Sequence, residues 1–512
     1  MQPLCRNQQL TRLAGQTFDV LVIGGGATGA GIALDAAARG LDTALIERHD
    51  FAGGTSSHSS KLIHGGVRYL EAAIRKLDPA QYRLVREALA EREILLKIAP
   101  HLVHPLPILL PVYGWVERLQ YRSGLWLYDR LAGSDRLPAS RFLSREETVQ
   151  ALPQLRRDGL QGSIRYHDAQ FDDVRMVITL LHTAIRQGAC VANYLEATGF
   201  VERDGRLAGV QVHDRQCDSR FQIRARVIIN ASGPQTDHVR RLADPDAEPL
   251  LALSRGSHIV LDGDWTASGH GMLINPTSDG RVLFVLPWQG HTLVGTTDIP
   301  AASGQEIRPD PGEVDYLLKH LQQWFDPAPG KEDVRASWAG LRPLPSRKDM
   351  PTAGIVREHL LEHGPGGLVT ITGGKWTTYR KMAEETVDLA VAAARLQPLR
   401  NCQTRSLLLA GAEGLDEDLP LQLVRRYRLD EDIGRHLVQS YGSLVWQLLE
   451  HSSASDRVRL VSGHPYIRAE LDWARSHEMA ITTEDILYRR LQLGLLDAED
   501  TRLASEQIPQ PE

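Results

Sequence analysis

Cysteine is scarce in this sequence. Four cysteines are scattered over 512 residues, at Cys5, Cys190, Cys217 and Cys402, and no two of them form a C-x-x-C pair. This scatter argues against a cysteine-held iron–sulfur cluster, a structural zinc site and a disulfide framework. It is typical of a protein in a reducing compartment, and we predict no metal site.

Long apolar runs and a large excess of one charge are also absent. No run of about 18 uncharged apolar residues occurs, so we predict no transmembrane helix. The 58 Lys and Arg residues nearly balance the 64 Asp and Glu residues, which argues against a protein that coats nucleic acid. Residues 1–17 hold no apolar core for a signal peptide, and we predict a disordered lead there rather than a transit peptide.

What the sequence does hold is a glycine-rich turn near its start. Residues 19–23, DVLVI, form a short apolar run that predicts a buried parallel strand. The following residues, GGGATG, fit the pattern G-x-G-x-x-G. Gly24 permits a tight turn, Gly26 lets the backbone approach a pyrophosphate, and Gly29 lets the next helix pack close to the sheet.

An acidic residue follows at the distance that a dinucleotide site requires. Residues 30–39 are rich in alanine and predict a helix, and residues 41–46 predict a second strand that ends at Glu47. This carboxylate lies about 20 residues past the glycines, where it can accept both hydroxyls of an adenosine ribose. A glycine-rich turn in another kind of α/β protein would leave Gly29 and Glu47 unexplained. We therefore predict a site for NAD or FAD.

The next loop is a second candidate for ligand binding. Residues 48–69 are dense in Gly, Ser and Thr and carry His58, Lys61, His64 and Arg68. A loop after the second strand lies at the carboxyl edge of a parallel sheet, where ligands bind. The apolar residues between these cations favour a buried functional segment over a solvated loop.

The remaining chain predicts three kinds of structure. Apolar spacing indicates helices at 81–99, 173–188 and 311–325, and strands at 226–233 and 367–374 that end in small residues. A helix that begins near Thr377 would point its N-terminus at the ligand edge of the sheet, where it can stabilise an anion. Residues 254–298 predict an antiparallel sheet, and amphipathic helices follow from about residue 403.

Three features allow two interpretations each. The aromatic and basic residues of 101–131 suit a bilayer interface, and they suit a protein core with arginines that extend to solvent. Arg342, between Leu341 and Pro343, suits recognition of a phosphate or carboxylate, or a structural salt bridge. A lone strand histidine such as His258 is more often structural than catalytic.

Six segments together resemble one protein family. In chain order they are GGGATGAGIALDAAARG, SSKLIHGGVRYLE, GTTD, AGLRPL, GGKWTTYRKMAE and EDILYRRLQLGL. Over nearly the whole chain they resemble the FAD-dependent glycerol-3-phosphate dehydrogenases, the aerobic, quinone-linked enzymes of bacteria and mitochondria. Some segments look closer to the mitochondrial branch, but the calcium-binding extension and a clear transit peptide are missing. We therefore expect a bacterial protein.

The resemblance implies an α/β fold with three domains. A Rossmann-like FAD-binding domain of the glycine oxidase and D-amino acid oxidase type would comprise residues 17–100, 150–245 and 345–400. An antiparallel-sheet substrate domain would comprise residues 101–149 and 246–344. Residues 401–512 would form a C-terminal helical domain.

The resemblance also implies FAD as the cofactor and assigns site residues. The residues expected around FAD are Asp19, Gly24, Gly26, Gly29, Glu47, Ser56, Ser60, Lys61, His64, Gly233, Gly374, Lys375 and Thr377. Those expected around the substrate phosphate are Arg68, Tyr69, Arg342 and Lys375. The expected catalytic residues are His64, His258 and Arg342, and the choice between the two histidines as the base stays open.

The implied reaction is oxidation of sn-glycerol 3-phosphate to dihydroxyacetone phosphate, with hydride transfer to flavin and electrons passed to a membrane quinone. We expect a peripheral protein on the cytoplasmic face of the inner membrane, with no nucleic-acid partner and a homodimer as one option. The alternatives are a glycerol-3-phosphate oxidase that uses oxygen, an oxidase of amino acids or other carboxylates, and a flavin-binding module without turnover. An NAD-dependent dehydrogenase would leave the flavin-side motifs unexplained.

Overall fold

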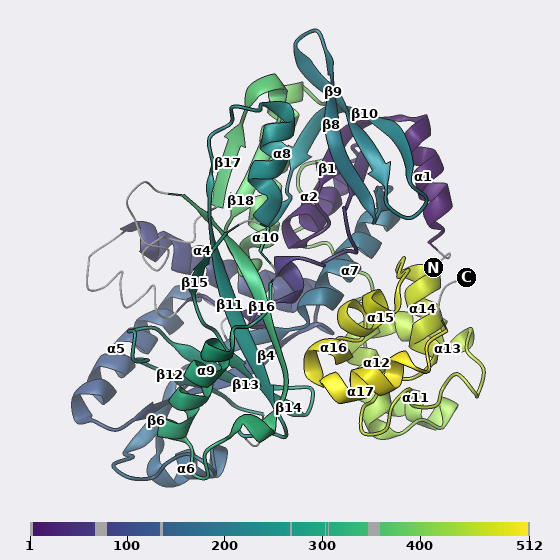
Figure 1. Cartoon of the computed structure of the whole chain (residues 1–512). Helices are drawn as coiled ribbons and strands as arrows, with labels where there is room; N and C mark the ends of the chain where they lie inside the picture. Colours follow the sequence, from purple (N-terminus) through teal and green to yellow (C-terminus); the bar gives the residue numbers. More distant parts are fainter. Residues whose placement is uncertain are drawn as a thin grey trace.

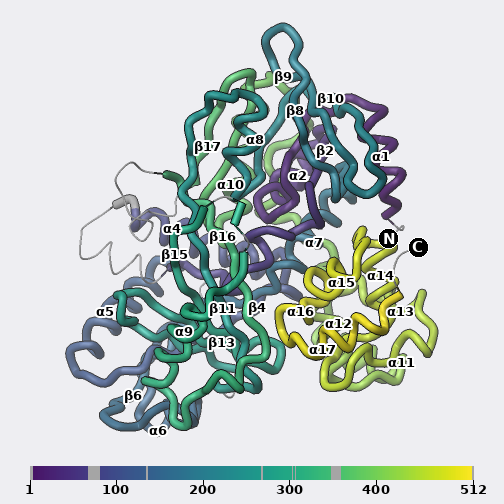
Figure 2. The backbone as a smooth tube through the Cα atoms, viewed as in Figure 1, coloured from purple at the N-terminus to yellow at the C-terminus, as the bar shows by residue number. Residues whose placement is uncertain are grey.

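The computed structural model describes residues 4–66, 79–133, 137–266, 269–302, 304–305, 307–346 and 359–509. This part of the chain forms two sheets and a group of C-terminal helices (Figure 1). The first sheet lies at the top of the view, the second at the lower left and the C-terminal helices, in yellow, at the lower right. The first and last described residues both lie near residues 475–476 (Figure 2), since the Leu4 N–H donates to the Ser476 carbonyl at 2.8 Å and the Arg475 guanidinium donates to the Pro509 carbonyl at 2.6 Å.

The first sheet has eight strands among the described residues, and its centre is parallel. Its main order is β17 (His359–His363), β18 (Val369–Gly373), β10 (Ser219–Asn230), β1 (Thr17–Ile23), β2 (Thr43–Ile46) and β7 (Cys190–Ala192). The hairpin of β8 (Leu195–Arg203) and β9 (Arg206–Asp214) pairs with β10. Consecutive residues from Val20 to Val22 are fully buried, as expected of a parallel strand covered on both faces.

Three helices pack together on one face of this sheet. They are α2 (Ala27–Ala38), α7 (Asp173–Arg186) and α10 (Tyr379–Ala394), and they share one apolar core with Val20 and Val22. Small side chains let α2 lie close to its neighbours, because a Cβ on Gly31 would stand 2.8 Å from the Tyr379 ring. Leu21 points to the opposite core, which it shares with α8 (Thr236–Ala243).

Residues near the start of the chain form α1 (Arg6–Gly15), so the prediction of a disordered lead is wrong. Leu13 is fully buried in the core that contains Phe18, and the Arg6 guanidinium pairs with Asp214 at 2.9 Å. Gln9 and Leu13 are the buried residues of this helix. Its stability therefore comes from tertiary contacts that local sequence does not reveal.

The second sheet has ten strands among the described residues. Its main order is β15 (Ile299–Ala301), β11 (Leu251–Leu261), β14 (His291–Gly295), β13 (Leu283–Trp288), β12 (Gly271–Ile274), β4 (Val103–Val112), β6 (Gly162–Phe171) and β3 (Leu62–Ile63). β16 (Val334–Pro345) pairs with β11, and β5 (Arg141–Ser144) pairs with β6. The strands β3 and β6 thus lie in the second sheet, although residues 17–100 and 150–245 were assigned to the FAD-binding domain.

The helices around this sheet are α4 (Pro79–Ile98), α5 (Trp115–Leu131), α6 (Arg145–Ala151) and α9 (Pro311–Trp324). The ambiguous segment 101–131 is therefore a strand followed by a helix. Leu125 and Tyr128 of α5 are buried, whereas Trp115 and Trp126 are exposed. In the described ranges, no helix is both long and apolar enough to cross a bilayer.

The C-terminal helices are α11 (Leu419–Tyr427), α12 (Glu431–Tyr441), α13 (Val445–Glu450), α14 (Ala469–His477), α15 (Thr483–Arg489), α16 (Leu493–Leu496) and α17 (Ala498–Ser505). Buried ion pairs join them to the first sheet and its helices. Arg490 pairs with Asp50 at 2.8 Å, and Arg175 of α7 pairs with Glu478 at 2.8 Å. Burial raises the pKa of Glu478, but the Arg175 guanidinium outweighs it and lowers that pKa to about 2.

Candidate active site

A cavity of about 810 Å³ lies between the two sheets. Its lining comes from the glycine turn after β1, the end of β2, the loop of residues 53–64, the strands β11 and β16, and the turn that precedes α10. The cavity therefore lies at the carboxyl end of the parallel strands, where ligands bind in open α/β sheets.

The three glycines of the G-x-G-x-x-G pattern each lie close to a neighbouring residue. Gly24 has φ of 117°, and a Cβ there would lie 2.5 Å from the Ala231 carbonyl oxygen. A Cβ on Gly26 would lie 2.9 Å from Ser56 Oγ, and one on Gly29 would overlap the Gly24 carbonyl oxygen. Gly24 and Gly26 line the cavity, whereas Gly29 serves the packing of the turn against α2.

Glu47 lies beside this turn and is tied to it through the backbone. Its Oε2 accepts the Gly25 N–H at 2.7 Å, and its Oε1 accepts the His49 N–H at 2.9 Å. Burial raises the pKa of this carboxyl, although both N–H groups oppose the shift. A half-buried carboxylate at the end of β2, next to a turn of glycines without side chains, fits the ribose and pyrophosphate of a dinucleotide.

The loop after β2 joins the turn to the second sheet. Ser56 Oγ accepts the Ala27 N–H at 2.9 Å, which satisfies a donor at the start of α2. Ser60 Oγ pairs with His258 Nε2 at 2.9 Å, and the His64 N–H donates to Thr377 Oγ1 at 3.2 Å. One short loop thus contacts three separate parts of the site.

His258 lies on β11 and is only 2% exposed, although it lines the cavity. Its ring stacks on Trp338, with the centroids 4.2 Å apart. Burial is the main cause that holds the pKa of His258 well below its ordinary value, and the charges of Arg342, Lys61 and His58 act in the same direction. The imidazole is therefore neutral at neutral pH and able to accept a proton.

Arg342 lies on the neighbouring strand β16, and its guanidinium is fixed by the segment after β14. Nη1 donates to the Thr297 carbonyl at 3.1 Å, Nη2 donates to Thr296 Oγ1 at 2.8 Å, and Asp298 lies 3.7 Å away. A Cβ on Gly256 of β11 would overlap the Arg342 guanidinium. The lack of a side chain at this position therefore leaves room for the guanidinium. A planar cation held in this way is preorganised for an oxyanion.

The structure brings most of the predicted site residues to one cavity. The predicted residues that line it are Gly24, Gly26, Glu47, Ser56, Ser60, His64, Gly233, His258, Arg342, Gly374, Lys375 and Thr377. Arg68 and Tyr69 lie outside the described residues.

Besides Gly29, two predicted cofactor residues do not line the cavity. Asp19 is at the amino end of β1, the opposite edge of the sheet, where it accepts the Asp42 N–H at 3.1 Å and pairs with Arg226 at 3.0 Å. Lys61 does not line the cavity, because its side chain turns into the protein interior and pairs with Asp173. We therefore remove both from the set expected to contact the cofactor.

Sequence reasoning missed other residues of the cavity. Thr296, Thr297 and Asp298 line it together with Arg281. The GTTD segment was part of the resemblance, but no role was assigned to it from the sequence, because the residue that it holds in place, Arg342, is distant in the chain. The signal that could have found it is a run of short polar residues directly after a predicted apolar strand.

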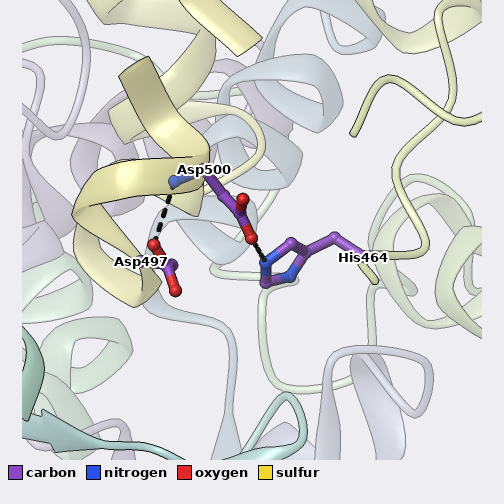
Figure 3. Close-up of side chains that lie close together, drawn as sticks. All are labelled: His464, Asp497 and Asp500. Atoms are coloured by element: carbon purple, nitrogen blue, oxygen red, sulfur yellow. Dashed lines mark hydrogen bonds and ion pairs between the residues drawn. The ribbon is translucent and has the colours of Figure 1, made fainter. Parts of the chain in front are cut away.

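A group of ionisable side chains that does not line this cavity lies among the C-terminal helices (Figure 3). His464 Nε2 pairs with Asp500 Oδ2 at 2.9 Å, and the Asp497 carboxylate accepts backbone N–H groups at the start of α17. These ligand atoms lie close enough together to hold a metal ion. Helix capping and one ion pair account for the arrangement, and we assign it to the packing of α17.

Comparisons with known proteins agree with this site. Residues 19–380 match the family described as FAD dependent oxidoreductase, and residues 402–510 match the C-terminal domain of alpha-glycerophosphate oxidase. The chain is 43% identical to the mitochondrial glycerol-3-phosphate dehydrogenase of Homo sapiens over 526 residues, which covers 99% of this chain and 71% of that protein. The chain belongs to the FAD-dependent glycerol-3-phosphate dehydrogenase family.

Two solved structures support the family and the fold. The glycerol-3-phosphate dehydrogenase from Bacillus halodurans, complexed with FAD, is 29% identical with a TM-score of 0.77, and the match covers 98% of this chain and 93% of that one. Glycine oxidase from Geobacillus kaustophilus is 19% identical with a TM-score of 0.56, and the match covers 76% of this chain and 98% of that one. The second likeness shows the fold alone. The predictions of the family, the fold class and FAD as the cofactor are confirmed.

The glycine turn provides a test of cofactor binding. A Gly29→Ala variant should lose most of its bound FAD, because the new methyl group would overlap the Gly24 carbonyl oxygen and displace the turn. Gly15→Ala is the matched control, since a Cβ there meets no atom within 4 Å. The ratio of flavin to protein absorbance after purification measures the effect. Equal ratios in the two variants would contradict the assignment of this turn.

Proposed function

We propose that this protein oxidises sn-glycerol 3-phosphate to dihydroxyacetone phosphate and passes the electrons to a membrane quinone. The supporting observation is that Arg342, Lys375 and His258 line the same cavity as the glycine turn and Glu47. FAD, when bound at that turn, supplies the acceptor for the hydride that leaves C2 of the alcohol. The chain's own residues then have to bind the phosphate and take up the hydroxyl proton.

Arg342 and Lys375 are the described residues that we assign to the phosphate. A phosphate dianion forms charge-assisted hydrogen bonds with guanidinium and ammonium groups, and these bonds strengthen in a half-buried cavity. The two residues come from different sheets, since Arg342 lies on β16 and Lys375 follows β18. Arg68 and Tyr69 remain further candidates for the same role.

We assign the base to His258 and leave His64 as the alternative. When the hydride leaves C2, the hydroxyl proton must leave as well, so that the carbon–oxygen double bond forms without net charge. His258 supports this role because it is buried, neutral and held through Ser60 at the cavity wall. The imidazole takes up the proton and becomes the imidazolium, which is later deprotonated by solvent.

Arg342 provides the test of the phosphate assignment. An Arg342→Ala variant should lower kcat/KM for sn-glycerol 3-phosphate by about 10- to 100-fold, since a hydrogen bond between charged groups contributes about 1.5–3 kcal/mol. Arg335→Ala is the matched control on the same strand, because Arg335 is exposed and pairs only with Asp262 among the described residues. An Arg342→Ala enzyme with unchanged kcat/KM would overturn the assignment.

A glycerol-3-phosphate oxidase is a second candidate function. It is favoured by the match of residues 402–510 to the C-terminal domain of alpha-glycerophosphate oxidase. The two functions share a substrate and differ in the electron acceptor.

The acceptor can be tested on the reduced protein. After anaerobic reduction with substrate, the protein is mixed with a ubiquinone analogue or with oxygenated buffer, and flavin reoxidation is followed. The dehydrogenase proposal predicts rapid reoxidation by the quinone analogue and little hydrogen peroxide. Rapid reoxidation by oxygen with stoichiometric peroxide, and none by the quinone, would favour the oxidase.

We also propose that α5 contacts the surface of the membrane that contains the quinone, on the cytoplasmic side of a bacterial inner membrane. Trp115, Leu119 and Trp126 of this helix are exposed by 73%, 67% and 58%. The exposed arginines Arg118 and Arg122 lie among them. Exposed aromatic and apolar side chains with interleaved cations suit the headgroup region of an anionic bilayer.

Charge reversal on α5 tests this contact. The double variant Trp115→Glu/Leu119→Glu should lose binding to vesicles of phosphatidylglycerol and phosphatidylethanolamine in a flotation assay, with turnover on a soluble acceptor unchanged. The control Leu421→Glu/Val458→Glu alters two apolar residues that are also exposed, among the C-terminal helices. If the double variant of α5 floats with the vesicles as well as the wild type does, the proposed contact is wrong and another surface must bind the membrane.

A further inference from the structure

Lys61 forms an ion pair in the interior, outside the cavity. Its Nζ donates to Asp173 Oδ1 at 2.6 Å and to Gln492 Oε1 at 2.8 Å, and the side chains of Lys61 and Asp173 have no exposed surface. Burying a lysine and an aspartate costs several kcal/mol of desolvation, and a well-packed apolar pair would often be as stable. Stability alone therefore gives a weak reason for this pair.

The ammonium group lies between two buried tryptophans next to His258. Nζ is 4.9 Å from the ring centroid of Trp288 and 5.6 Å from that of Trp338, distances at which a cation is attracted to an aromatic face. Trp338 in turn stacks on the His258 ring at 4.2 Å with an interplanar angle of 23°. A single indole ring thus separates Lys61 from the imidazole that lines the cavity.

A second route connects the same ion pair with His258. Ser59 Oγ donates to Asp173 Oδ2 at 2.7 Å, and the Lys61 N–H donates to Ser59 Oγ at 2.9 Å. The intervening Ser60 pairs through its Oγ with His258 Nε2 at 2.9 Å. The ion pair therefore fixes both the ring on which His258 stacks and the loop that holds its Nε2.

We propose that Lys61 is a positioning residue for His258, fixed by Asp173 and by Gln492 from the C-terminal helices. Gln492 lies between α15 and α16, and no described residue from 402 onward lines the cavity. The C-terminal helices would thus influence His258 without lining the cavity, through the side-chain amide of Gln492. The inference rests on the proposed function in one respect, namely that His258 accepts the substrate proton.

Removal of the Lys61 charge should change the pH dependence of the rate in a way that a purely structural change would not. The charged and titratable groups that face His258 are Arg342, Lys61 and His58, and each adds to the effect of burial in lowering the pKa of His258. Removal of Lys61 should therefore raise this pKa and increase the protonated, inactive fraction on the acid side of the pH–rate profile. The acid limb of the pH–rate profile should move to higher pH, whereas a merely structural loss would lower the rate equally at every pH.

The experiment compares FAD-loaded Lys61→Met and Gln492→Leu with the wild type and with Tyr466→Phe. Tyr466→Phe is the matched control, because Tyr466 joins the C-terminal helices to Gln289 of the second sheet without touching Lys61. The rate of anaerobic flavin reduction by sn-glycerol 3-phosphate is measured from pH 9 down to the lowest pH at which the variants stay folded. We expect the acid limb of Lys61→Met to lie about one pH unit above that of the wild type, so that the variant is about tenfold slower on that limb. Gln492→Leu should shift the acid limb in the same direction by less.

The outcomes decide between a positioning and a structural role. If Lys61→Met fails to fold because Asp173 is left unpaired, Gln492→Leu retains the ion pair and decides the question. A Gln492→Leu profile that coincides with that of Tyr466→Phe would overturn the proposal. A folded Lys61→Met protein with the pH–rate profile of the wild type would also overturn it.

A second readout does not depend on the substrate. In histidine-labelled protein, the NMR titration of the His258 ring, assigned with His258→Gln, should show a higher pKa in Lys61→Met than in the wild type. If this shift occurs but sn-glycerol 3-phosphate does not reduce the wild-type flavin, the positioning inference stands and the proposed function fails. If the flavin is reduced but the titration does not shift, the proposed function stands and the positioning inference fails.

Discussion

The position of one loop, residues 55–64, governs the rest of the active site. The loop contacts the start of α2 through Ser56, the second sheet through Ser60 and the turn before α10 through the His64 backbone. Its anchor is the buried ion pair of Lys61 with Asp173, at the first turn of α7. Since α7 packs on the first sheet and β11 belongs to the second, the loop that this pair anchors joins the cofactor turn to the strand that carries His258.

The cofactor half of the site was predictable because its determinants are local. Gly24, Gly26 and Glu47 belong to one strand–turn–helix–strand unit, in which sequence spacing alone fixes the geometry. Asp19, which the resemblance assigned to the cofactor, begins the strand and so lies at the opposite edge of the sheet. The resemblance also assigned Lys61 to the cofactor, but its side chain pairs with Asp173 in the interior, and no sequence pattern predicts the positive φ of 55° at this residue.

The substrate half of the site was predictable only through the resemblance. His258 and Arg342 become neighbours because β11 and β16 pair in antiparallel register, with Ser254 opposite Arg342. Lys375 reaches the same cavity because β18 pairs with β10. These are contacts between residues far apart in the chain, and neither composition nor periodicity encodes them. The GTTD segment illustrates this limit, since its threonines acquire a role only through the distant Arg342.

The most direct test of the account is an anaerobic titration of the purified, FAD-loaded protein. The absorbance of the oxidised flavin is followed after addition of sn-glycerol 3-phosphate, and in parallel after addition of glycerol, lactate or glycine. The account predicts rapid bleaching by sn-glycerol 3-phosphate alone, because only that compound offers both the secondary alcohol and the phosphate that the cavity cations bind. Flavin that stays oxidised with sn-glycerol 3-phosphate, or that glycine or lactate bleaches as fast, would contradict it.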